Sequence, residues 1–168
     1  MNNVQLINAD SGNTEWYTPK EIVDAARNTM GGIDLDPFSS YTANKRVRAE
    51  NFYSKEEDGW NQKWYGNIWM NHPFSRKNNK ALNYKIEREM CNFKSLCFIT
   101  FAATSEAWFR PFLKYPQCFL EGRTNYYLPD GTKKRGVTKG SVVTYIGLNL
   151  EAFYENFKDL GVIKVVYK

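Results

Sequence analysis

The sequence predicts a single α/β domain in which a sheet lies between two layers of helices. Short apolar segments typical of buried strands alternate with segments whose apolar residues recur at helical spacing. At 168 residues, the chain is long enough to form one hydrophobic core without disulfides or a metal. It contains no repeat and no low-complexity tract. We therefore expect one three-layer domain over residues 15–168, preceded by a mobile segment over residues 1–14.

The first predicted elements are a helix and a short strand. Thr18-Pro19 is typical of a helix start, with threonine as N-cap, proline at the first helical position and Glu21 able to reach back to the cap. Gly31-Gly32 ends this helix. A strand follows over residues 33–38, where a proline terminates the ladder of backbone hydrogen bonds. Asp36 is therefore expected at the carboxyl end of that strand.

The middle of the chain predicts two further helices and two further strands. A short helix is expected over residues 42–49, and apolar strands over residues 66–70 and 95–101. Between these two strands, Asn78-Asn79 marks the polar start of a helix. Its apolar face carries Leu82, Ile86, Met90 and Phe93.

The last third of the chain predicts more strands than helices. Residues 105–109 begin a helix that Pro111 interrupts, and residues 150–160 form the last helix. Asp130-Gly131 is typical of a hairpin turn. Strands are expected over residues 117–121, 125–128, 142–148 and 162–167.

A candidate binding site stands directly after the strand at residues 66–70, at Asn71-His72-Pro73-Phe74. This turn combines an amide oxygen, backbone carbonyls and an aromatic face, and it contains the only histidine of the chain. Such a turn suits a flat amine such as the exocyclic NH2 of a nucleobase. Ligands of α/β sheets sit beyond the carboxyl ends of strands, so we expect Asp36 and Asn71 to share one cleft.

The charge distribution predicts a nucleic-acid partner. Lys and Arg number 23 against 18 Asp and Glu, and the pI is about 9.0. The basic residues cluster with few acids between them, beside the turn and in the loop after residue 131, and each cluster can meet phosphate. A solvated surface is the alternative interpretation. The residues expected to bind nucleic acid are Arg76, Lys77, Lys80, Lys133, Lys134 and Arg135.

Composition excludes several other classes of protein. Cys91, Cys97 and Cys118 form no Cys-x-x-Cys pair and are expected to be reduced, mostly core thiols. One histidine excludes an iron site with two histidines, and no metal site is expected. No apolar run approaches the ~20 residues of a membrane span and no signal peptide is present, so we expect a cytoplasmic protein.

The turn at Asn71 resembles the Asn-Pro-Pro-Tyr/Phe signature of amino-group DNA methyltransferases, with histidine replacing the first proline. Over about residues 15–145, the chain resembles the phage-type family of DNA N6-adenine methyltransferases, which are Dam-like. An ordered series of residues carries this resemblance: Trp16-Tyr17-Thr18-Pro19, Leu35-Asp36-Pro37, the spaced Asn44, Val47 and Ala49, then Asp58-Gly59, Trp64 and Gly66.

The resemblance implies a Rossmann-like fold that binds S-adenosylmethionine and transfers its methyl group to N6 of adenine in DNA, in the bacterial host's cytoplasm if the gene is phage-borne. It implies that Asp36 holds the amino-acid or ribose end of the donor and Asp58 the adenine end. The turn Trp16-Tyr17-Thr18-Pro19 would pack the methionine end. At the acceptor, Asn71 and the His72 carbonyl would accept the two N–H bonds, while Pro73 fixes the turn and Phe74 stacks on the base.

Two departures leave alternatives open. No Gly-x-Gly follows Asp36, and Asp34 competes with it as the functional carboxylate. His72 can be a neutral spacer, a contact to the base or the mark of a changed amino acceptor. A re-purposed, inactive nucleic-acid-binding relative is a rival function. A hydrolase that uses His72 and Ser75 is a second rival, but no Gly-x-Ser-x-Gly elbow supports it. The sequence gives no indication of the oligomeric state.

Overall fold

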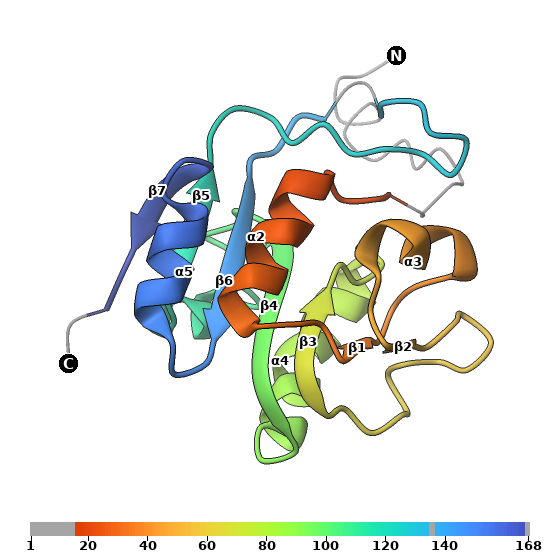
Figure 1. Ribbon diagram of the computed structural model, residues 1–168. Helices are drawn as coiled ribbons and strands as arrows, with labels where there is room; N and C mark the ends of the chain where they lie inside the picture. The colour runs from red at the N-terminus through yellow and green to blue at the C-terminus, as the bar shows by residue number, and fades with distance from the viewer. Residues whose placement is uncertain (1–15, 135–136, 167–168) are drawn as a thin grey trace.

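A single mixed sheet forms the centre of the protein in the computed structural model, which describes residues 16–134 and 137–166 (Figure 1). Within these residues the strand order is β2-β1-β3-β4-β6-β5-β7. The strands are β1 (Leu35–Asp36), β2 (Asn51–Phe52), β3 (Gly66–Met70), β4 (Phe93–Phe101), β5 (Gln117–Leu120), β6 (Ser141–Ile146) and β7 (Gly161–Lys164). Strands β2, β1, β3 and β4 run parallel, whereas β6 is antiparallel to β4 and β5, and β7 is antiparallel to β5.

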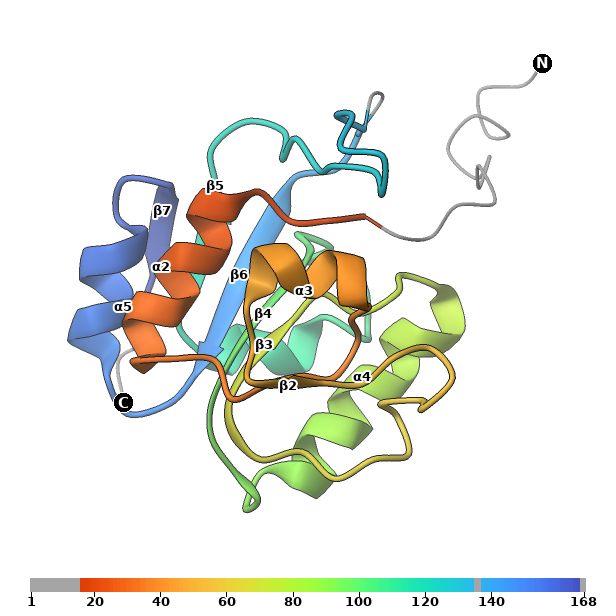
Figure 2. The same cartoon turned by 45° about the vertical axis from the view of Figure 1, so that its right-hand side comes forward.

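Helices cover both faces of this sheet (Figures 1 and 2). One apolar cluster joins α2 and α5 to the sheet, and a second joins α4 and the short 3-10 helix to its other face. Side chains of β3 alternate between them, because Trp69 belongs to the first cluster while Ile68 and Met70 belong to the second. The helices are α2 (Lys20–Met30), α3 (Tyr41–Val47), α4 (Arg76–Glu89), α5 (Leu150–Phe157) and the 3-10 helix η1 (Arg110–Lys114).

The predicted alternation of strands and helices is confirmed, but several element boundaries are wrong. The strand expected over residues 33–38 contains two paired residues, because Pro37 lacks the N–H that would continue the ladder. Helix α4 begins two residues before the predicted start, since the Ser75 hydroxyl accepts a hydrogen bond from the Asn78 N–H and caps it. Phe93 lies in β4 rather than on that helix.

Three other expectations fail for local reasons. Residues 105–109 form turns, and Pro111 instead occupies the first turn of η1, where its missing N–H costs nothing. Residues 125–128 form no strand; Tyr127 makes only isolated bridges, to Tyr17 and Lys133. Thr18 does not cap α2, which begins after Pro19 without a side-chain cap. The predicted turn at Asp130-Gly131 does form, with Gly131 at a positive φ of 83°.

Helix α4 also braces the segment before β3 through a buried ion pair. The Lys85 ammonium lies 2.8 Å from a Glu89 carboxylate oxygen and donates to the Gln62 carbonyl at 2.6 Å, while Glu89 accepts from the Trp64 N–H at 3.2 Å. Burial alone would raise the pKa of Glu89, but hydrogen bonds from Lys85, Asn92 and Trp64 hold it at about 2. The segment that precedes β3 is therefore anchored to a rigid helix.

The cysteines agree with the expectation of reduced thiols that lie mostly in the core. Cys97 and Cys118 are buried and Cys91 is exposed, and all are free thiols. Burial raises the pKa of Cys118 to about 12, which keeps this thiol protonated and unreactive. In the described part of the chain, no helix has the length and apolar character needed to span a bilayer.

Candidate active site

A cavity of about 260 Å³ opens at the carboxyl ends of β1 and β3. The chain runs from β1 to β2 on one side and then returns to β3 on the other, so the cavity lies where the strand order switches. Asp36 and Asn71 both line it, as predicted. Of the predicted catalytic and cofactor residues, the cavity is lined by Trp16, Thr18, Asp36, Asp58, Asn71, His72, Pro73 and Phe74, but not by Pro19.

The Asn71 side chain is held in one orientation. Its Nδ2 donates to the Trp16 carbonyl at 2.7 Å and to the Thr18 hydroxyl at 3.2 Å. These two contacts use both amide hydrogens, so the carbonyl oxygen Oδ1 is the part left for a ligand. They also explain why Thr18 caps no helix, since its hydroxyl serves Asn71 instead. Two segments 55 residues apart in sequence therefore meet at this amide.

His72 is buried, with 1% of its surface exposed. Its Nε2 lies 2.9 Å from Asn79 Oδ1, and its ring packs edge-on against Phe74 and Trp60 at centroid distances of 4.9 and 6.0 Å. Burial lowers the pKa of His72 to about 4, although the contact with Asn79 acts in the opposite direction. The ring is therefore neutral near pH 7.

The environment of His72 argues against the hydrolase alternative. A general base works best with a pKa near the operating pH, and the pKa of His72 is well below it. Its Nε2 contacts Asn79 rather than Ser75, whose hydroxyl caps α4 by accepting from the Asn78 N–H at 3.0 Å. The two residues that this mechanism requires are each engaged elsewhere.

Asp36 is a buried carboxyl group at the cavity wall, 3% exposed. It accepts the Phe38 N–H at 3.1 Å, and no described lysine or arginine forms an ion pair with it. Burial raises the pKa of Asp36 to about 7, and the Phe38 N–H offsets this only in part. A buried carboxyl without a cationic partner is suited to a ligand that brings an ammonium or hydroxyl group.

Asp34 does not line this cavity. Its Oδ2 accepts the backbone N–H of Asn67 at 2.6 Å, which ties the start of β3 to the segment before β1. A side chain on Gly66, which has a φ of 64°, would collide with this carboxylate. Of the two competing carboxylates, Asp34 is thus a structural partner and Asp36 faces the cavity.

The turn at Asp58 also lines the cavity. Asp58 has a φ of 54°, and its carboxylate accepts from the Trp60 N–H at 3.2 Å and from Asn61 Nδ2 at 2.7 Å. The Trp60 ring lies 4.5 Å from that of Phe38, and both rings line the cavity. Sequence reasoning missed these two aromatic side chains, because only the packing of the two loops brings them together.

Basic side chains and aromatic rings lie together around the cavity. Arg46 on α3 lines it and stacks on Tyr127 at 4.3 Å. Lys134 lies over Trp16 at 5.3 Å, and Lys139 lies over Phe101, whose ring contacts Phe74 at 4.7 Å. The chain that leads up to Lys134 passes above α3 and the segment before α2 (Figure 2).

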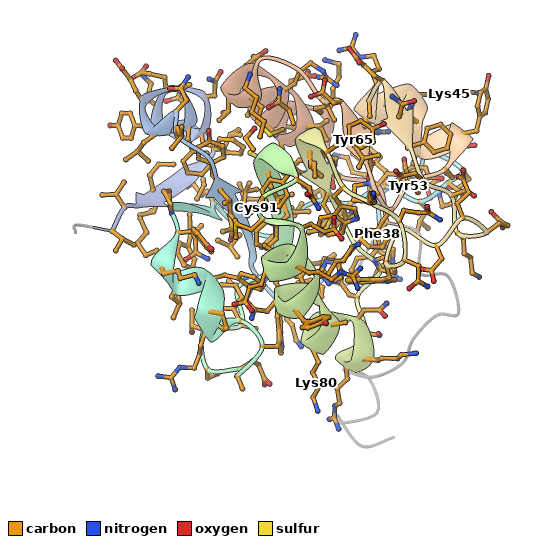
Figure 3. The ribbon with its side chains drawn as sticks, turned by 90° about the horizontal axis from the view of Figure 1, so that it is seen from below. Phe38, Lys45, Tyr53, Tyr65, Lys80 and Cys91 are labelled. Atoms are coloured by element: carbon orange, nitrogen blue, oxygen red, sulfur yellow. The ribbon has the colours of Figure 1, made fainter. Side chains whose placement is uncertain are left out.

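The other predicted phosphate-binding residues are not part of the cavity lining. Arg76, Lys77 and Lys80 are exposed on α4 and do not line the cavity. Figure 3 shows Lys80 on α4 pointing away from the protein, and Lys45 on α3 at a different edge. Lys133 is exposed, and Arg135 lies outside the described residues. Lys134 and Lys139 therefore pack on aromatic rings that line or adjoin the cavity, whereas Arg76, Lys77 and Lys80 do not line it.

Comparison with known families identifies the chain. A family model of DNA N-6-adenine-methyltransferases (Dam) matches residues 7–156. The chain belongs to the Dam family. Membership in the Dam family supports DNA adenine methylation as the activity and DNA as the class of substrate, and it confirms the resemblance seen in the sequence. No curated protein matches the chain.

Proposed function

We propose that this Dam-family chain transfers the methyl group of S-adenosylmethionine to N6 of adenine in DNA, within a Rossmann-like domain. The observation that carries the proposal is the orientation of Asn71. Contacts with Trp16 and Thr18 fix its Nδ2 and leave Oδ1 for an amine in the cavity that Asp36 also lines. The proposed sites for the adenine amine and for the methyl donor therefore lie in the same cavity.

The proposed reaction depends on how the protein positions the adenine amine, and less on acid–base catalysis by a side chain. The lone pair of adenine N6 is delocalised into the ring, so two hydrogen-bond acceptors on its N–H groups make the nitrogen more nucleophilic and aim it. Asn71 Oδ1 and the His72 carbonyl are these acceptors in our proposal, and Phe74 supplies the stacking face. Pro73 holds the turn, and its own carbonyl accepts a hydrogen bond from Asn78 Nδ2 at 2.8 Å.

The donor residues proposed are Trp16, Thr18, Asp36 and Asp58, which line the cavity, whereas Pro19 contributes by fixing the backbone after Thr18. S-adenosylmethionine, when bound, would supply an electrophilic methyl group: the N6–C bond would form as the S–C bond breaks, and the demethylated thioether would leave. Asp36 suits the donor because its buried carboxyl lacks a cation, which the α-ammonium group would provide. The methylated amine then releases its proton to water, so no side chain has to act as a base. The neutral His72 fits this mechanism.

DNA binding is proposed to involve phosphate contacts on the side of the cavity that carries Arg46, Lys133, Lys134 and Lys139. Arg135 belongs to the same basic stretch of sequence, and Arg76, Lys77 and Lys80 are candidates for more distant contacts. A second depression adjoins the cavity and shares Tyr17 and Arg46 with it, so a strand that enters the cavity would pass these side chains.

The salt dependence of DNA binding tests these phosphate contacts. Replacing Arg46 with glutamine should make the slope of log affinity against log salt less steep by about one unit, because one phosphate contact is lost. Arg48→Gln is the matched control at the C-cap of the same helix, since the Arg48 guanidinium lies 3.7 Å from an Asp24 carboxylate oxygen. Filter binding over a series of salt concentrations measures both slopes. Equal changes in the two variants would exclude a specific contact by Arg46.

The polymer that is methylated can be identified directly. The purified protein is incubated with S-adenosylmethionine labelled in its methyl group and with separate pools of DNA and RNA. We expect label in DNA and none in RNA. Label only in RNA would overturn the proposed substrate. Donor binding without label in either pool would indicate an inactive nucleic-acid-binding relative.

A further inference from the structure

The turn that presents Asn71 has histidine at the position where the signature it resembles has proline. Proline restricts its own φ to about −65° and so stiffens a turn. Histidine lacks this restriction, so other contacts must hold the His72 backbone if its carbonyl is to point consistently at a bound amine. The structure shows where such contacts come from.

The first turn of α4 supplies them. Asn79 Oδ1 lies 2.9 Å from His72 Nε2, and the neighbouring Asn78 donates to the Pro73 carbonyl at 2.8 Å. Trp60 and Phe74 contact the imidazole ring edge-on. Since the Asn79 oxygen can only accept, it selects the imidazole tautomer that carries its proton on Nε2. No donor among the described residues reaches Nδ1, so no other hydrogen bond orients the ring.

We propose that Asn79 is a positioning residue of the methyltransferase site. By holding the His72 ring through Nε2, Asn79 fixes the turn so that the His72 carbonyl and Asn71 Oδ1 remain aimed at the acceptor amine. A side-chain hydrogen bond from α4 thus replaces the stiffness of a proline ring. The catalytic part of this inference rests on the proposed function, whereas the tautomer of His72 does not.

The tautomer can be measured without any activity, because His72 is the only histidine. In protein labelled with ¹⁵N-histidine, long-range ¹H–¹⁵N spectra should show one imidazole with protonated Nε2 and bare Nδ1. Asn79→Ala should produce a mixture of tautomers, and Asn79→Asp, which keeps an acceptor oxygen, should restore the Nε2–H form. A wild-type ring protonated at Nδ1, or a spectrum unchanged in Asn79→Ala, would overturn the proposal.

Kinetics test the coupling to the turn. Asn79→Ala should lower kcat about tenfold with little change in KM for donor or DNA, as expected for lost alignment of one acceptor. Asn79→Asp should recover most of that loss. In a His72→Pro background, adding Asn79→Ala should have little further effect on kcat, because Asn79 then has no ring to hold.

Asn83→Ala is the matched control, since Asn83 lies one turn further along α4 and its side chain makes no hydrogen bond to any residue that the structure describes. It should leave both the spectrum and kcat unchanged.

An equal loss of kcat from Asn79→Ala in the wild-type and His72→Pro backgrounds would contradict the positioning mechanism. If the wild-type protein methylates nothing, the proposed function fails while the spectra still decide the tautomer. If Asn79→Ala does not fold, the wild-type spectrum and Asn79→Asp still decide it.

Discussion

Replacement of Asn71 with alanine is expected to lower the rate of methyl transfer to DNA about 10²-fold or more. The change removes one of the two acceptors proposed for the adenine amine, and a lost hydrogen bond to a reacting group in a buried site commonly costs that much. Donor affinity should fall much less than the rate, because Asn71→Ala leaves Asp36 in place and affects the proposed donor residues only through its contacts with Trp16 and Thr18. Single-turnover rates at saturating donor and DNA measure the effect.

The structural consequences of this variant need a control. Alanine also leaves the Trp16 carbonyl and Thr18 hydroxyl without the Asn71 amide, so a lower melting temperature is expected. Thr18→Val removes one of these contacts and keeps the Asn71 oxygen, so it should destabilise the protein by a similar mechanism with a smaller loss of rate when the donor is saturating. Asn71→Ala that retains more than a tenth of the wild-type rate would contradict the assignment of this residue.

Replacement of Asp36 with alanine is expected to weaken binding of S-adenosylmethionine by about 1.5–3 kcal/mol, or roughly 10- to 150-fold. This is the range for losing a hydrogen bond to a charged group. Titration calorimetry with the donor and with its demethylated product measures the change. Absence of binding heat with either compound in the wild-type protein would exclude the proposed donor site.

The pH dependence of donor binding gives a second test of Asp36. Its pKa is raised to about 7 in the free protein, so the carboxyl is mostly protonated at lower pH, whereas a bound ammonium favours the ionised form. Donor affinity should therefore rise with pH up to about 7 and then level off, and binding at pH about 6 should release a proton. Calorimetry in buffers of different ionisation enthalpy detects that proton, and Asp36→Asn should abolish its release. Proton uptake would contradict the assignment.

The same pKa values change how a pH–rate profile should be interpreted. From sequence alone, a rate that rises near the ordinary histidine pKa of ~6.5 would indicate a reacting His72. Burial moves the pKa of His72 to about 4 and that of Asp36 to about 7, so a rise near neutral pH reports Asp36. Such a rise should persist in His72→Gln.

Sequence patterns predicted the parts of the fold that depend on local rules. The strand β3 was expected with its observed bounds, since a five-residue, largely apolar run followed by a proline turn is too short for a helix and favours a strand. The sequence also predicted that Asp36 and Asn71 would share a cleft, because the carboxyl ends of neighbouring parallel strands lie at the same edge of a sheet. The two-residue strand β2 was missed because so short a pairing leaves no periodicity.

The contacts within the site were harder to predict, because they join side chains far apart in sequence. Thr18 matched a helix cap, yet its hydroxyl contacts Asn71, a residue 53 positions away. Asn79 matched a polar helix start, and only the packing of α4 beneath the turn places it against His72. Polar residues near helix ends have several possible partners, so tertiary contacts decide among them.

The identity of the methylated atom tests the central proposal most directly. DNA is incubated with the wild-type protein and S-adenosylmethionine carrying a deuterated methyl group, then digested to nucleosides and separated by liquid chromatography with mass detection. The proposed site predicts N6-methyldeoxyadenosine that carries the deuterated methyl group, strongly reduced in Asn71→Ala. Labelled N4-methyldeoxycytidine, or no labelled nucleoside from a protein that binds the donor, would contradict it.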